Sequence, residues 1–118
     1  MRVARVAPFF SLISLVAASL AFAQPAHVDV QSAAGALDRE QALRGLDGSA
    51  ESLGACFGDP AGVLATLRVN RSGVVASVRF MESSGDEGID RCVSRVLREA
   101  RFERASGRTT LYVVVRVD

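Results

Sequence analysis

The sequence predicts an α+β domain in which a three-stranded antiparallel sheet carries two helices on one face. Residues 46–57 and 89–100 repeat apolar positions at helical spacing. Residues 63–82 and 111–117 alternate apolar and polar positions, as half-buried strands do. The order is helix, strand, strand, helix, strand. It predicts that the last strand pairs with the first, which gives the spatial order 2-1-3.

Residues 1–23 are predicted to be a cleaved secretory signal peptide. Arg2 and Arg5 form a positive start, residues 6–20 are mostly apolar, and Ala21 and Ala23 are small residues at the expected cleavage positions. The alternative is a retained membrane anchor, because residues 6–23 approach the ~17–25 residues that a membrane-spanning helix needs. Cleavage would leave 12 of the 14 Arg residues against 13 acidic residues.

Residues 24–46 are predicted to be an N-terminal linker or weak helix. Residues 24–36 are small and polar with no sustained period, which is typical of a flexible segment. Residues 37–46 have helical content that Gly45 interrupts. The folded domain is therefore expected to span residues 47–118.

The first predicted helix follows Asp47 or Ser49, either of which can cap it, and ends before Gly58 and Pro60. Its apolar face is expected to contain Leu46, Ala50, Leu53, Cys56 and Phe57.

A hairpin is predicted next, with Gly73 in the left-handed conformation of its turn. The inward positions are expected to be Val63, Ala65, Leu67 and Val69, and then Val74, Ala76, Val78 and Phe80.

The second predicted helix begins at a capping box of Ser84 and Glu87, or at Asp86. Its apolar face consists of Ile89, Cys92, Val93, Val96, Leu97 and Ala100. In the last strand, Leu111, Val113, Val115 and Val117 share one face, and Tyr112, Val114 and Arg116 lie on the other.

Cys56 and Cys92 are the only cysteines. In an exported chain an even count favours one structural disulfide, here between the inward faces of the two helices. Free thiols are one alternative. A redox pair is another, although redox cysteines usually lie close together in the sequence.

Composition indicates a non-enzymatic protein without metal or cofactor. The net charge of +1 argues against a nucleic-acid binder, and the single His, His27, leaves no His-based catalytic group or zinc site. Arg91, Arg95 and Arg98 form a basic helix face. It is either a patch for anionic lipid or an acidic partner, or a solvated face paired through Glu87–Arg91 and Arg95–Glu99.

Residues 47–118 resemble the C-terminal domain shared by the gliding-motility proteins AgmX and PglI, a TonB C-terminal-like module of myxobacteria. The resemblance rests on Leu53, Cys56-Phe57, Gly62, Leu64, Leu67, Val69, Ser72-Gly73, Val75, Ser83-Ser84, Asp90, Cys92-Val93, Ala100 and Phe102. It implies an envelope-facing α+β domain without catalytic residues. TonB proteins pair a receptor peptide with a sheet edge, whereas this chain has no long Pro-rich segment.

These observations predict a small periplasmic or secreted protein of a Gram-negative envelope that binds a protein or peptide. The expected site is the outer edge of the last strand at Tyr112, Val114 and Arg116, where a partner would add a strand or a second copy would form a homodimer. The alternatives are a membrane-retained energy-transduction or gliding-motility component, and a small secreted enzyme or inhibitor.

Overall fold

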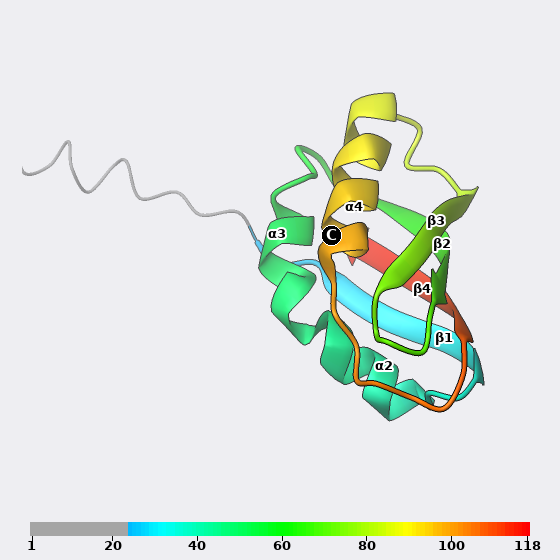
Figure 1. Cartoon of the computed structure of the whole chain (residues 1–118). Helices are drawn as coiled ribbons and strands as arrows, with labels where there is room; N and C mark the ends of the chain where they lie inside the picture. The colour runs from blue at the N-terminus through cyan, green and yellow to red at the C-terminus, as the bar shows by residue number, and fades with distance from the viewer. Residues whose placement is uncertain (1–23) are drawn as a thin grey trace, which may run out of the picture.

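The computed structural model describes residues 24–118 as a four-stranded antiparallel sheet with the order β1-β4-β2-β3 (Figure 1). The strands are β1 (His27–Gly35), β2 (Ala61–Val69), β3 (Val75–Glu82) and β4 (Thr109–Val117). The helices are α2 (Arg39–Leu46), the 3₁₀ turn η2 (Asp47–Ser49), α3 (Ala50–Gly54) and α4 (Glu87–Glu99). The predicted signal peptide lies outside the described residues.

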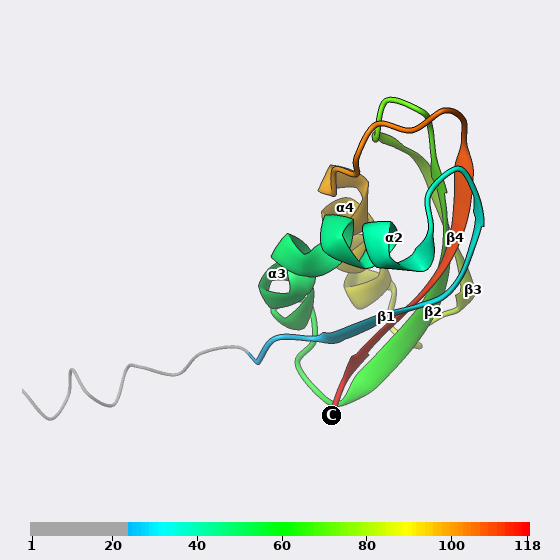
Figure 2. The same ribbon diagram turned by 90° about the horizontal axis from the view of Figure 1, so that it is seen from below.

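Within residues 24–118, all three α-helices lie on one face of the sheet, and the other face carries no helix (Figure 2). The core therefore forms a single layer between sheet and helices. Its fully buried side chains include Leu46, Leu53, Leu67, Leu97, Leu111, Val30, Val69, Val93, Val113 and Val115. This arrangement confirms the predicted α+β class.

The predicted sheet is correct in order but lacks one strand. β3, β2 and β4 follow the expected 2-1-3 arrangement, and β1 pairs with the far side of β4. β1 arises from the segment expected to be a linker. Val28 and Val30 alternate toward the core, and a bulge between Val30 and Ser32 then shifts the register. The alternation of apolar residues in β1 is too short to predict a strand, and pairing with β4 holds this strand in place.

The predicted weak helix is α2, and a capping box at its start defines it. The Asp38 side chain accepts from the Gln41 amide, and the Gln41 side chain accepts from the Asp38 amide. Ala42 and Leu46 are buried against the sheet. Because β1 and α2 contribute to the core, the folded unit begins well before the predicted boundary at residue 47.

The next helix is shorter than predicted and has no side-chain cap. η2 joins α2 directly to α3, so the chain is already helical when it reaches Ser49. The Ser49 side chain makes no capping hydrogen bond. α3 ends at Gly54, before Cys56.

The β2–β3 turn forms as predicted, but the register of β3 differs from the expected one. Gly73 has a φ of 90°, and the Asn70 Oδ1 atom accepts from the amides of Ser72 and Val74. A bulge skips Ala76, because Val69 pairs with Val75 and Arg68 pairs with Ser77. Val75 is therefore buried, whereas Val74 and Ala76, predicted to face inward, are exposed.

α4 follows the predicted pattern closely. Of the two proposed caps, Asp86 is the one that acts, because its side chain accepts from the Ile89 amide at 3.1 Å. Val93, Val96 and Leu97 are buried as expected.

Candidate functional site

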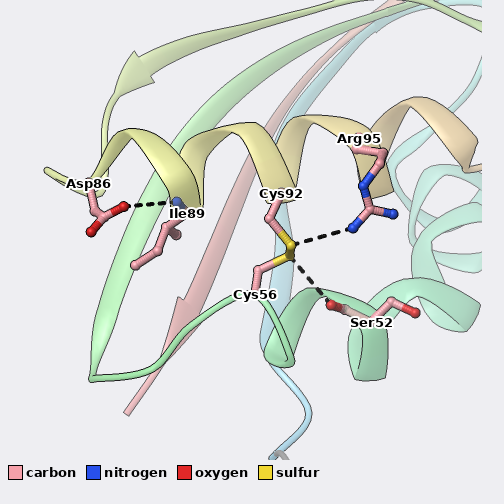
Figure 3. The surroundings of a disulfide bond; sticks show 6 residues. All are labelled: Ser52, Cys56, Asp86, Ile89, Cys92 and Arg95. Carbon is pink, nitrogen blue, oxygen red and sulfur yellow. Dashed lines mark hydrogen bonds between the residues drawn. A yellow bond between two sulfur atoms is a disulfide. The ribbon is translucent and has the colours of Figure 1, made fainter.

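A disulfide joins Cys56, just after α3, to Cys92 in the middle of α4 (Figure 3). The S–S distance is 2.10 Å and the two Cα atoms lie 5.6 Å apart. The predicted bridge is thus present, although both cysteines are half-buried rather than inside the core. It fixes the end of α3 against α4.

One polar atom lies close to each sulfur of the disulfide. The Ser52 carbonyl oxygen lies 3.6 Å from Cys56 Sγ, and Arg95 Nη2 lies 3.7 Å from Cys92 Sγ (Figure 3). A shallow hollow of about 610 Å³ runs along this side of α4. It is lined by Arg91, Cys92, Ser94, Arg95, Arg98 and Glu99.

The basic helix face is present on α4 and is partly compensated. Arg91 lies 3.8 Å from Glu87, and both side chains are largely exposed. Arg98 Nε donates to Ser94 Oγ at 3.3 Å. The expected Arg95–Glu99 ion pair is not formed among residues 24–118. Exposed pairs of this kind contribute about 0–1 kcal/mol, which is typical of a solvated helix face.

The predicted partner-binding edge on β4 is wrong. Tyr112, Val114 and Arg116 lie on an inner strand, because β1 pairs along β4 from His27–Arg116 to Gly35–Thr109. Their side chains lie on the helix-free face of the sheet instead. There, Tyr112 lines a hollow of about 480 Å³ together with Thr66, Arg68, Ser77, Arg79, Met81 and Thr110.

The outer edge of the sheet at β1 is covered in part by the chain itself. Arg39 Nε donates to the Val30 carbonyl at 2.8 Å, and its guanidinium pairs with Asp29. The contact lies at the β1 bulge. A side chain therefore occupies a carbonyl that an added strand would use.

The outer edge of the sheet at β3 is open over a continuous stretch. At its start, an isolated bridge joins Val74 to Arg101, and the Phe102 amide donates to the Gly73 carbonyl at 2.9 Å. Beyond that point, residues 77–82 have β2 as their only strand partner among residues 24–118. Met81, in this stretch, is 60% exposed.

A cluster of hydrogen bonds fixes the connection from β3 to α4. The Asp90 carboxylate accepts from the hydroxyls of Ser83 and Ser84 and from the Ser84 amide. Burial acts to raise the pKa of Asp90, and these three donors outweigh it, so the pKa lies below its ordinary value. Asp90 thus acts as an ionised anchor between Ser83, Ser84 and the first turn of α4.

His27 does not assemble a catalytic group with the serines. Its Nε2 lies 3.2 Å from an Asp118 carboxylate oxygen, and both side chains are about two-thirds exposed. Ser83 and Ser84 follow β3 at the opposite edge of the sheet. Strands are ~4.8 Å apart, so three strand spacings separate the two by ~14 Å.

The predicted 2-1-3 order already placed β3 at an outer edge, but the last strand was preferred as the site because no fourth strand was assigned. The run from His27 to Val30 alternates polar and apolar residues, and this signal could have revealed β1. With β1 in place, β4 becomes an inner strand, and β3 remains an edge strand whose only strand partner within residues 24–118 is β2.

Comparisons of the chain with protein-family models, with curated proteins and with solved structures find no match.

Within residues 24–118, no group of three or more His, Cys, Asp or Glu side chains is placed to hold a metal ion. In the same residues, no helix has both the length and the apolar character needed to cross a membrane.

Proposed function

We propose that this chain is an exported, non-catalytic envelope module that binds an extended protein segment by adding it as a strand to the edge of β3. The observation that carries the proposal is the outer side of β3 at residues 77–82, which pairs with β2 on its inner side and has no second strand partner among residues 24–118. An edge strand offers backbone donors and acceptors to a partner, and backbone pairing of this kind supplies affinity. The resemblance to TonB C-terminal-like domains supports the same mode of binding.

The side chains around this edge supply the selectivity. On the helix side, Phe80 and Ile89 are half-buried at the border of the core, and α4 contacts β3. On the other face, Arg79 and Met81 are exposed. An added strand would place alternate side chains against an apolar border and against a mixed basic and apolar one. We therefore propose a partner segment that alternates apolar with polar or acidic residues.

Export is part of the proposal, and the disulfide supports it. Disulfides persist in oxidising compartments, and the bridge between Cys56 and Cys92 fits a periplasmic or secreted protein. Non-reducing peptide mapping and N-terminal sequencing of the exported chain test this part. A chain that begins at Gln24 supports cleavage, and one that retains residues 1–23 supports the anchor alternative.

The binding mode is tested with linear peptides selected from a display library against oxidised residues 24–118. Amide exchange is then measured with and without the selected peptide. We expect the backbone amides within residues 77–82 to gain protection, while those of β1 do not. Selection of no peptide, or protection confined to another region, contradicts the proposal.

A matched pair of variants locates the peptide independently. Met81→Lys changes an exposed residue on β3, and Ala34→Lys changes an exposed residue on β1. We expect Met81→Lys to weaken peptide binding about tenfold, because it adds a charge and removes an apolar contact beside the added strand. Ala34→Lys should leave the affinity unchanged. The reverse result would place the peptide at β1.

A further inference from the structure

Two loops meet at one end of the sheet and form a fixed structure. The β2–β3 turn contacts the loop from α4 to β4 through two backbone hydrogen bonds, from the Phe102 amide to the Gly73 carbonyl and from the Ala105 amide to the Arg71 carbonyl. Their lengths are 2.9 and 3.0 Å. A Cβ atom on Gly73 would lie 2.0 Å from the Phe102 carbonyl oxygen. The close approach fixes the backbones of the two loops relative to each other, so the positions from which their side chains project are also fixed.

Four exposed arginines lie in these loops or at the adjoining end of β2, and we call them the arginine pole: Arg68, Arg71, Arg104 and Arg108. Arg71 and Arg104 line one hollow of about 370 Å³, together with Ser72, Ala105 and Ser106. Arg68 and Arg108 line a second hollow of about 210 Å³, together with Val69, Asn70, Ala76 and Ser77. The two segments that supply these residues are far apart in the sequence, so only the fold brings them together.

The charge of the arginine pole is not compensated among residues 24–118. No carboxylate of these residues lies within 4.0 Å of any of the four guanidinium groups. The acidic residue of the α4–β4 loop, Glu103, pairs with Arg44 at 2.8 Å instead. Arg101 donates to the carbonyls of Arg98 and Ala100 at the end of α4. The pole therefore keeps a local positive potential in a chain whose net charge is only +1.

We propose that the hollow between Arg71 and Arg104 binds a phosphate group carried by a phosphomonoester. Guanidinium groups donate two parallel hydrogen bonds to phosphate oxygens, and two of them can neutralise a dianion. The Ser72 hydroxyl donates to Asn70 Oδ1 at 2.6 Å, so Ser106 is the hydroxyl that remains to donate to the anion. Arg68 and Arg108 would strengthen the field around the bound group. This site does not depend on strand addition at β3.

The ligand chemistry has two sources, a free phosphomonoester and the headgroup of phosphatidic acid. The experiment titrates residues 24–118, labelled with ¹⁵N, with inorganic phosphate at constant ionic strength set by chloride. In parallel, the protein is sedimented with phosphatidylcholine vesicles that contain or lack phosphatidic acid. We expect shifts at residues 71–73 and 104–107 in the first measurement, phosphatidic-acid-dependent sedimentation in the second, or both. The arm that responds identifies the source.

Matched double variants separate a site from general electrostatic attraction. Arg71→Gln with Arg104→Gln removes two charges from the pole, and Arg91→Gln with Arg98→Gln removes two charges from α4. All four side chains are exposed, so both variants are expected to fold. The pole variant should weaken binding about tenfold or more, and the α4 variant less than about twofold. Equal losses in both variants, or no binding in either arm, would overturn the proposal.

Discussion

The two edge strands of the sheet, β1 and β3, are protected in different ways. Along β1, a neighbouring side chain reaches the backbone, because Arg39 binds the Val30 carbonyl and pairs with Asp29. Along β3, protection consists of two bulges that skip Ala76 and Met81, together with the charges of Arg79 and Glu82. The β1 edge is covered in part by its own chain, whereas the β3 edge is only discouraged from pairing. The difference shows that one edge is held by contacts within the fold, whereas the other depends on bulges and charges.

The largest expected effect tests whether β1 is structural. Val30 is 0% exposed, so Val30→Asp would bury a carboxylate without a partner and should cost about 4 kcal/mol or more, or prevent folding. Met81→Asp, on exposed β3, should change the free energy of unfolding by no more than about 0.5 kcal/mol. Urea denaturation of both variants measures this. Small and equal losses would mean that β1 is a dispensable linker.

Removal of the disulfide tests the connection between the helices that cover the two halves of the sheet. The bridge spans 36 residues, and its loss in Cys56→Ala with Cys92→Ala should lower stability by about 3–4 kcal/mol. The far-UV circular dichroism spectrum should stay the same, because the core residues are unchanged. An unchanged melting temperature would contradict this prediction.

Gly73→Ala tests how firmly the start of β3 is tied to the α4–β4 loop. A φ of 90° disfavours a side chain, and the new Cβ would meet the Phe102 carbonyl, so we expect a loss of about 2 kcal/mol. Gly107→Ala is the control, because a Cβ there meets nothing within 4 Å. Thermal melts of the two variants compare them, and similar melting temperatures would argue against a strained contact.

Arg39→Gln tests whether the contacts of Arg39 protect the β1 edge and leave the β3 edge unaffected. The variant loses the hydrogen bond to Val30 and the ion pair with Asp29, which together should cost about 1 kcal/mol. Amide exchange should quicken in β1 and remain unchanged within residues 77–82. Faster exchange throughout the sheet would indicate global destabilisation instead.

Asp90→Asn should have an effect about as small as that of Arg39→Gln, and its size should depend on pH. The variant keeps an acceptor and loses the charge, so we expect a loss of about 1 kcal/mol at neutral pH. The pKa of Asp90 in the folded protein lies below its ordinary value of 3.8, so ionisation stabilises the fold above that pH. The stability difference between the two proteins should shrink as the pH falls below about 4. Denaturation across this range tests the prediction, and a constant difference would contradict it.

Local patterns predicted the elements that carry strong periodicity. α4, the β2–β3 hairpin and β4 repeat apolar residues often enough for their burial to be foreseen, and the two cysteines lie close enough to bond. β1 was missed because only Val28 and Val30 show its alternation before the bulge, and β4 supplies the rest of its stability. The bulge at Ala76 also shifted the β3 face, since bulges have no reliable sequence signal.

The missing strand explains the error in the candidate site. With β1 unrecognised, Tyr112, Val114 and Arg116 were placed at an edge that the chain itself covers. A proline at Val114 or Val115 would disrupt a ladder inside the sheet, because β4 pairs with β1 and with β2 at these positions. The arginine pole was beyond the reach of local patterns for another reason, because it requires two distant loops to touch.

The pairing of β1 with β4 also determines how the domain responds to mechanical tension. His27 pairs with Arg116 at the same end of the sheet where β1 begins and β4 finishes. A force that separates residues 27 and 116 therefore peels β1 from β4 one hydrogen-bonded pair at a time, which resists far less than shearing all pairs together. The disulfide then keeps residues 56–92, with β2 and β3, in a closed ring that cannot lengthen. Under tension, β1 should therefore separate from β4 at low force, and only the residues outside the 56–92 ring should extend.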